Sequence, residues 1–234
     1  MRVVAWNCMG GFAHKAAALE QLAPDIAIVS EVTRAAVESA NATDAAWIGA
    51  DHDKGLALFS WNGWRLEDVV GAPERHVLAA QTRRDGVTVS VVGVWPSPLR
   101  GDYVAPIDRG LRHLSGRLAG DVIVAGDFNA NPIWDVNKAP PLKFATILDD
   151  LRARDIRSTW HEQSGDDHGA ERTPTFFWRM NERQRFHIDY IFASAGLRRR
   201  IETVRIGAYQ DWVATKLSDH APVIADFAPH SSAG

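Results

Sequence analysis

Polar residues that can bind metal ions or move protons stand at the ends of short apolar runs in this chain. The run Val-Ile-Val-Ala at 122–125 is followed directly by Gly-Asp-Phe-Asn. Such a run is typical of a buried strand, which would place Asp127 and Asn129 at its carboxyl end, where open α/β sheets usually bind ligands. The other polar residues at the ends of predicted strands, or inside one, are Asn7, Glu31, Asp189, Asp219 and His220.

One part of this set fits the needs of a hard divalent cation. Mg²⁺ prefers carboxylate, amide and water oxygens, and Glu31, Asn7 and Asp219 offer such atoms. Zinc is less favoured, because Cys8 is the only cysteine and no histidines have ligand spacing. We interpret His161 and His168 as flanking a solvated acidic loop.

Another part fits proton transfer. His220 with the carboxylate of Asp189 forms the kind of pair that acts as a general base or stabilises charge. The neutral amide of Asn129 can donate to a developing negative oxygen. Each residue alone could instead cap a helix or fix a turn, and His187 is left out as an ordinary strand residue.

The apolar runs predict an α/β chain with many short strands. Strands are expected at 2–7, 25–30, 56–61, 76–82, 87–95, 121–125, 187–192, 200–206 and 222–227, and helices at 14–21, 33–40, 104–118 and 142–154. No helix is expected between 56 and 94, which favours mixed or antiparallel pairing. Antiparallel pairing would let both carboxyl and amino ends of strands share one edge, so the polar residues could converge.

Composition limits the kind of protein. The 234 residues suit one domain, predicted at 1–229 with a disordered tail at 230–234. A net charge of −3 leaves room only for a local basic patch as a polyanion site. The lone Cys8 and the absence of a signal peptide or membrane span near Met1 predict a cytoplasmic protein, with a monomer as the default.

The ordered motifs resemble those of the exonuclease–endonuclease–phosphatase superfamily. The segments that carry the resemblance are Trp6-Asn7-Cys8, Ser30-Glu31, Gly126-Asp127-Phe128-Asn129, His187-Ile188-Asp189-Tyr190 and Ser218-Asp219-His220. The group includes exonuclease III-type nucleases, pancreatic deoxyribonuclease, sphingomyelinases, inositol polyphosphate phosphatases and deadenylases. The resemblance implies a four-layer sandwich of two packed mixed β-sheets flanked by helices.

The resemblance also implies roles for single residues. Glu31 and Asn7 would hold Mg²⁺, or Mn²⁺, with Asp219 nearby. Asp127 would orient or deprotonate the attacking water, and Asn129 would help to bind the phosphate. Asp189 would fix His220, which acts in this family as a general base or stabilises the transition state. Which of Asp127 and His220 takes the proton stays open.

One position departs from the family pattern. Family members usually carry a phosphate-contacting His or Tyr before the Gly-Asp-x-Asn strand, whereas this chain has Trp95, which offers only an indole N–H. Either a phosphate contact is lost, with Trp95 packing at the strand end, or Tyr103 or Arg100 replaces it. The aromatic residues of 173–178 could stack on a base, but core packing is the favoured interpretation.

The leading functional prediction is a Mg²⁺-dependent phosphodiesterase, most simply a nuclease acting on DNA or RNA. Arginines that could follow a nucleic-acid backbone, or equally form an ordinary surface, are Arg179, Arg183, Arg185, Arg198, Arg199 and Arg200. The alternative is a phosphoesterase acting on a small nucleotide, sugar or lipid head-group phosphate. A non-catalytic binding module is disfavoured, because every acid and the His–Asp pair are present.

Overall fold

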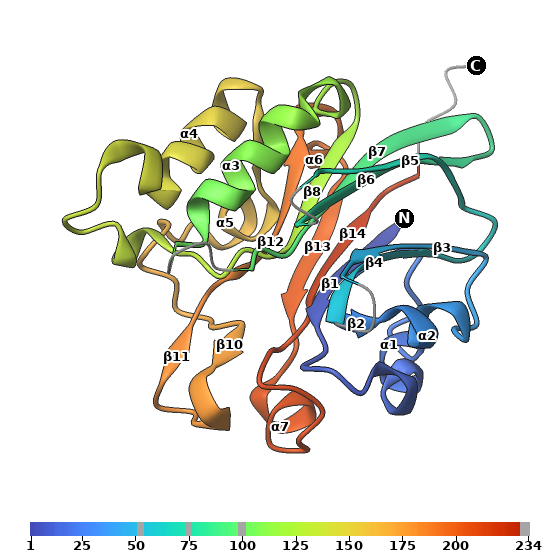
Figure 1. The fold of residues 1–234 in the computed structure, drawn as a ribbon, viewed down its shortest axis with the longest axis horizontal. Coiled ribbons are helices and arrows are strands. Elements are labelled where there is room, and N and C mark those ends of the chain that lie inside the picture. Colours follow the sequence, from blue (N-terminus) through green and yellow to red (C-terminus); the bar gives the residue numbers. More distant parts are fainter. Residues whose placement is uncertain (51–53, 74–75, 98–101, 230–234) are drawn as a thin grey trace.

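Two six-stranded β-sheets pack face to face, with helices on both outer faces (Figure 1). The structure is a computed structural model that describes residues 1–50, 54–73, 76–97 and 102–229. This layer order confirms the predicted four-layer sandwich of mixed sheets. The predicted tail at 230–234 and the candidate residue Arg100 lie outside the described residues.

The first sheet contains both ends of the described chain. Its strand order is β13 (Ile201–Ile206), β14 (Val223–Phe227), β1 (Arg2–Asn7), β2 (Ile26–Thr33), β4 (Lys54–Ser60) and β3 (Asp44–Gly49). Strand β1 runs parallel to β2 and antiparallel to β14. The carboxyl end of β1 therefore lies beside the carboxyl end of β2 and the amino end of β14.

The second sheet contains the middle of the chain. Its strand order is β5 (Arg65–Gly71), β6 (Val77–Arg84), β7 (Val87–Val94), β8 (Val122–Asp127), β12 (Asp189–Ser194) and β9 (Ile156–Ser158). Strands β7 and β8 are parallel, and β12 is antiparallel to β8. A separate two-stranded hairpin pairs β10 (Phe176–Phe177) with β11 (Arg185–Phe186).

Alternation along the strands divides the apolar residues between three clusters. In β8, Ile123 and Ala125 face the layer between the sheets, whereas Val122 and Val124 face the outer helices. The outer helices on the second sheet are α3 (Val104–His113) and α4 (Phe144–Ala153). The first sheet is covered by α1 (Ala16–Glu20), α2 (Arg34–Glu38) and α7 (Tyr209–Trp212).

Shorter elements complete the described chain. The remaining α-helices are α5 (Thr159–Ser164) and α6 (Ala195–Arg198), and the 3-10 turns are Phe12–His14, Ser115–Arg117, Pro132–Trp134, Pro140–Leu142 and Trp178–Met180. The helix predicted over 104–118 ends at His113 and resumes as the turn at 115–117. Within the described ranges, no helix is both long and apolar enough to cross a bilayer.

The predicted strands are all present, with shifted ends. The short strands β9, β10 and β11 were not predicted, and neither were two longer strands. The longer two are β3 and β5, which lie at the edges of the two sheets and are largely half-buried or exposed. Edge strands face water on more sides, so they need no long apolar run. The strand predicted from His187 begins two residues later, at Asp189.

The segment 161–173 is not the solvated loop that the sequence predicted. The side chains of His161 and Glu171 are 9% and 5% exposed. The His161 ring stacks against Tyr190, and the His168 ring stacks against Phe192. Both aromatic residues belong to β12, so the segment packs on the second sheet. His161, His168 and Glu171 are drawn into the protein, while Glu162, Asp167 and Arg172 stay exposed.

Candidate active site

The candidate catalytic residues meet where the ends of strands from both sheets come together. Strands β8 and β12 pair so that Asp127 lies directly opposite Asp189. The Nδ1 atom of His220 lies 2.9 Å from Oδ2 of Asp189. His220 comes from the turn before β14 of the first sheet, so this hydrogen bond joins the two sheets.

Asp127 is the most connected of these residues. Its Oδ2 accepts a hydrogen bond from Nδ2 of Asn7 at 2.9 Å and from Nδ2 of Asn129 at 3.0 Å. The backbone amide of Asn129 donates to Oδ1 at 2.8 Å. Asn7 ends β1 of the first sheet, which gives a second link between the sheets. The structure thus brings together Asn7, Asp127, Asn129, Asp189 and His220, as the sequence predicted.

Glycine precedes Asp127 for a steric reason. Gly126 has φ of +137°, and a Cβ atom at this position would lie 2.1 Å from the carbonyl oxygen of Val94. A side chain there would push β8 away from β7 and move Asp127 with it. The Gly-Asp sequence therefore fixes where the carboxylate stands.

An unusual backbone conformation orients the side chains of Glu31 and Asn129. Glu31 has φ of +62°, and the pairing of β2 with β4 shifts register between Ser30 and Val32. Such a bulge turns one residue out of the ladder. Asn129 also has a positive φ, of +48°. A positive φ is uncommon for glutamate, whereas asparagine adopts it more readily.

Glu31 stands at the more open side of the site. Its Oε1 accepts from Nδ2 of Asn7 at 3.2 Å, and its Oε2 lies 2.6 Å from Nζ of Lys54. Burial raises the pKa of Asp219, and the charge of Glu31 raises it further. Two carboxylates that repel each other beside a carboxamide are a donor set that fits a hard divalent cation. The ammonium of Lys54 supplies positive charge to the carboxylate of Glu31.

Asp127, Asp189 and His220 form the buried centre of the site, and this centre has an unusual charge distribution. Burial and the charge of Asp189 raise the pKa of Asp127 to about 7. Burial would lower the pKa of His220, but Asp189 and Asp127 outweigh it and raise that pKa to about 10. His220 is therefore an imidazolium at neutral pH, held between two carboxyl groups. Oδ1 of Asp189 is buried and has no hydrogen-bond partner among the described residues.

Three residues that received no role from the sequence hold this arrangement. Oγ of Ser218 donates to the carbonyl of Asn7 at 2.7 Å and accepts from the amide of His220 at 3.0 Å. Oγ1 of Thr175 accepts from the amide of Asp189 at 3.0 Å. Lys54 is the third. Ser218 lies in the Ser218-Asp219-His220 motif and Thr175 in the segment 173–178, whereas nothing in the sequence pointed to Lys54, which lies 23 residues from its partner Glu31.

A cavity of about 340 Å³ opens beside Asn129. Its wall includes six aromatic side chains, namely Tyr103, Trp134, Phe144, Phe176, Trp178 and Phe186. Phe176 also contacts the ring of His220, with centroids 4.6 Å apart. Tyr103 therefore lies at a cavity that reaches the site, whereas Trp95 is half-buried and packs against the core between the sheets.

The aromatic residues of 173–178 are only partly core. Phe177 is buried in the cluster under the first sheet, which confirms core packing there. Trp178 is 51% exposed, so core packing is the wrong interpretation for this residue. The chain turns out of the sheet into the β10–β11 hairpin at this point, and Trp178 follows it to the surface.

The predicted arginines fall into two groups. Arg179, Arg183 and Arg185 are exposed on the β10–β11 hairpin, next to the aromatic cavity. Arg198 is 12% exposed and bonds to Asp155, at the opposite end of β12 from Asp189. Arg200 donates to the carbonyl of Ala228. Arg199 is exposed between them, so the second group lies at the end of β12 away from the site.

Comparisons with known proteins agree with this geometry. The sequence profile of the Endonuclease/Exonuclease/phosphatase family matches residues 4–220. No curated protein sequence is significantly similar to the chain.

Solved structures with the same fold are similar over nearly the whole chain. The structure of the 3′ phosphatase NExo from Neisseria, bound to product DNA hairpin, is 19% identical, with a TM-score of 0.73 over 98% of this chain and 100% of that one. An AP endonuclease from Archaeoglobus fulgidus is 16% identical, with a TM-score of 0.75 over 98% and 100%. TDP2 from Caenorhabditis elegans is 15% identical, with a TM-score of 0.71 over 97% of each chain. The profile match confirms the predicted family and phosphoester hydrolysis: the chain belongs to the endonuclease/exonuclease/phosphatase family.

Proposed function

We propose that this protein is a Mg²⁺-dependent phosphodiesterase that cleaves nucleic acid, with one nucleoside of the substrate seated in the aromatic cavity. The observation that carries the proposal is the position of Asn129. Its side chain bonds to Asp127 in the buried centre, and the same residue lines the cavity. A phosphate held at Asn129 would therefore have its attached nucleoside beside Trp134 and Phe176.

The cavity has the chemistry of a base or sugar site. Aromatic faces stack on nucleobases, and each such contact is worth roughly 1–3 kcal/mol. Exposed arginines on the neighbouring hairpin, Arg179, Arg183 and Arg185, supply positive charge for the phosphates that follow. The net charge of −3 argues for a short contact with a few nucleotides rather than a long duplex.

The residues divide the chemistry between them. Glu31, Asn7 and Asp219 would hold Mg²⁺, which supplies positive charge beside the phosphate. Asp127 orients the attacking water and takes its proton. The imidazolium of His220 is held by Asp189. It donates a hydrogen bond to a phosphate oxygen on which negative charge develops. Asn129 positions the phosphate, and Tyr103 replaces the phosphate contact that Trp95 lacks.

The setting of the enzyme belongs to the same proposal. We expect a single domain over 1–229 and a monomer. The free thiol of Cys8 is buried, and burial raises its pKa to about 11, so it is an inert core residue. A reducing compartment such as the cytoplasm suits it.

Hydrolysis assays test the proposal directly. An aryl phosphodiester, single- and double-stranded DNA and RNA, and a nucleoside monophosphate are each offered with Mg²⁺, with Mn²⁺ and with EDTA. We expect metal-dependent cleavage of nucleic acid. Cleavage of the monophosphate alone would contradict the diester assignment and favour a small phosphomonoester instead.

A matched pair of variants tests the cavity. Trp134 is 39% exposed on the cavity wall, and Val136 is 74% exposed outside it. Trp134→Ala should raise KM for a nucleic acid about fivefold or more, the equivalent of one lost stacking contact. Trp134→Ala should leave KM for the aryl diester unchanged. Val136→Ala should leave KM unchanged for both the nucleic acid and the aryl diester. Equal effects of Trp134→Ala on both substrates would remove the cavity from the binding site.

A further inference from the structure

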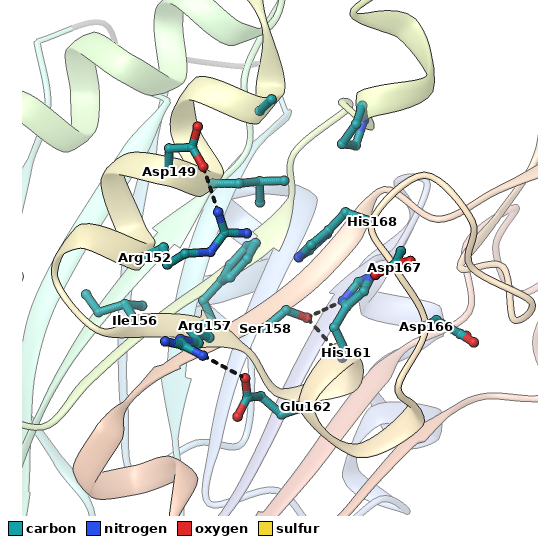
Figure 2. Close-up of a pocket in the computed structure, with 14 residues that line it drawn as sticks. Asp149, Arg152, Ile156, Arg157, Ser158, His161, Glu162, Asp166, Asp167 and His168 are labelled. Atoms are coloured by element: carbon teal, nitrogen blue, oxygen red, sulfur yellow. Dashed lines mark hydrogen bonds and ion pairs between the residues drawn. The ribbon is translucent and has the colours of Figure 1, made fainter.

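A second group of metal-ligating side chains lies apart from the candidate active site. His161 belongs to α5, and His168 and Glu171 follow it in the segment that packs on β12. One ligand atom of each lies within 4.8 Å of the others. Figure 2 shows His161 and His168 side by side on the wall of a cavity. Nothing in the proposed phosphodiester chemistry uses these residues.

Two of the three side chains have pKa values below their ordinary range. Burial would raise the pKa of Glu171, but hydrogen bonds from His161 and from backbone amides lower it to about 2. Burial and the neighbouring His161 lower the pKa of His168 to about 3. The donor groups are placed together by geometry: Nε2 of His161 lies 3.2 Å from Oε1 of Glu171, and one ligand atom of His168 lies within 4.8 Å of both residues' ligand atoms.

Supporting hydrogen bonds already orient two of the ligands. Nδ1 of His161 lies 2.7 Å from Oγ of Ser158, which leaves Nε2 facing Oε1 of Glu171 at 3.2 Å. Nδ2 of Asn131 donates to both carboxylate oxygens of Glu171, at 3.1 and 3.2 Å. Bound metal ions in proteins commonly have such outer partners on their histidine and carboxylate ligands.

Unpaired nitrogen atoms point to a missing partner. Nδ1 of His168 and Nε2 of His187 are buried and have no hydrogen-bond partner in the part of the chain that the structure describes. His187 is 3% exposed, and its Nδ1 lies 2.9 Å from the carbonyl of Thr173. A carbonyl can only accept, so the proton is on Nδ1 and Nε2 carries a lone pair. Buried polar atoms without partners are rare.

We propose that His161, His168 and Glu171 bind a divalent transition-metal ion, for which Zn²⁺ fits best, and that His187 lies at the edge of this site as a further nitrogen ligand. Two or three imidazoles and one carboxylate suit zinc, whereas Mg²⁺ prefers oxygen ligands. The His187 and His161 rings are 5.5 Å apart. The proposal does not depend on the nuclease assignment.

Binding would rearrange the site slightly. The His161 and His168 rings are stacked, with centroids 3.6 Å apart. Ligand atoms around a tetrahedral zinc ion are about 3.4 Å apart. The rings would therefore rotate until both lone pairs point at one ion. The proton on Nε2 of His161 would move to Nδ1, where Oγ of Ser158 can accept its hydrogen bond, and the hydrogen bond between His161 and Glu171 would be replaced by two metal–ligand bonds. The ion would fasten the segment 161–171 onto β12, which begins at Asp189.

Zinc titration of untagged protein tests the proposal. The metal-stripped protein is held in excess Mg²⁺, which fills hard-cation sites, and Zn²⁺ is added in competition with a chromogenic chelator. We expect one bound Zn²⁺ per chain and a rise in Tm on binding. His168→Gln and Glu171→Gln should each weaken Zn²⁺ binding at least tenfold or so.

Two controls make the result decisive. His113→Ala removes an exposed histidine and should leave Zn²⁺ affinity unchanged. His220→Ala removes the histidine of the candidate active site and should keep the Zn²⁺ ion. Loss of Zn²⁺ binding in His220→Ala, or equal binding in wild type and His168→Gln, would overturn the proposal.

Cobalt spectroscopy of the unaltered protein covers the case in which a variant does not fold. Co²⁺ in a four-coordinate site with imidazole ligands absorbs strongly in the visible range, and hexaaqua Co²⁺ does not. We expect this absorption in wild type and in His220→Ala, both in excess Mg²⁺. Its absence from both would overturn the proposal whatever the variants do.

Discussion

The two sheets contribute different kinds of side chain to the one site. The first sheet supplies Glu31, and Asp219 lies just before its strand β14; these side chains are 23% and 24% exposed. The second supplies Asp127 and Asp189, which are 1% and 0% exposed. An exposed carboxylate can exchange water for a cation, whereas a buried one holds a fixed charge. We infer that carboxylates of the first sheet bind the metal ion, whereas residues of the second sheet accept the proton and position the phosphate.

His220 connects these two tasks. It precedes β14 of the first sheet, yet its ring bonds to Asp189 of the second. The charge of an imidazolium in a buried site acts at full strength, because little water screens it. The difference between the sheets therefore predicts that substitutions in each will change a different kinetic parameter.

Replacing His220, which joins the two sheets, should have the largest effect. His220→Ala should lower kcat by a factor on the order of 10²–10³ at saturating Mg²⁺, the usual cost of losing a donor that stabilises developing negative charge. Initial-rate kinetics on the best nucleic-acid substrate measure kcat of the variant and the wild type, and a melting curve checks that the variant is folded. His113→Ala, which alters an exposed histidine, is the matched control. A kcat within tenfold of wild type would mean that Asp127 works without His220.

A smaller effect is expected at the metal side of the first sheet. The ammonium of Lys54 lies 2.6 Å from Oε2 of Glu31 and competes there with an incoming cation. A partly exposed ion pair of this kind is worth about 0.2–1 kcal/mol. Lys54→Met should therefore lower the Mg²⁺ concentration for half-maximal rate by about two- to fivefold. Lys216→Met, at an exposed position, serves as the control. A higher Mg²⁺ requirement in Lys54→Met would show that Lys54 assists the ion or the substrate.

The smallest effect concerns the far end of the same sheet. Arg2 begins β1 and bonds to Asp226 of β14 at 2.7 Å. Burial would raise the pKa of Asp226, but hydrogen bonds from Arg2 and Thr203 and the charge of Arg205 lower it. A lowered pKa means stabilisation that is present above the ordinary value of 3.8 and is lost as pH falls below it.

Asp226→Asn should reduce the free energy of unfolding by about 1 kcal/mol at pH 7. Denaturant titrations at pH 7 and pH 3 should show the difference from wild type shrinking at the lower pH. The Mg²⁺ dependence of the rate should not change, because Asp226 is at the other end of the sheet from Asn7. A shift in that dependence would mean that the metal side of the sheet is not independent of its far end.

The sequence predicted most of the strands and the convergence of the candidate catalytic residues. Strands such as 122–127 could be predicted because both faces are buried and the run is continuously apolar. Strands β3 and β5 could not, since edge strands carry mixed residues. The motif residues Asp127 and Asp189 were found because each stands at a strand end, and antiparallel pairing brings strand ends together.

Contacts between distant segments were beyond the reach of the sequence. Lys54 bonds to Glu31 only because β4 pairs with β2, and no spacing in the chain shows this pairing. His161 and His168 stand in a polar stretch that looks solvated, and their burial depends on the aromatic face of β12. A polar composition shows that a segment can be solvated. It does not show which surface of the protein the segment packs against.

The most direct test of the division between the sheets is a Mg²⁺ titration of two variants on one nucleic-acid substrate. Glu31→Gln should raise the half-saturating Mg²⁺ concentration by roughly tenfold or more while kcat recovers at high Mg²⁺. Asp127→Asn should lower kcat by a factor on the order of 10² or more with little change in half-saturation. If both variants moved the same parameter by the same factor, the two sheets would not have separate tasks and the account would be wrong.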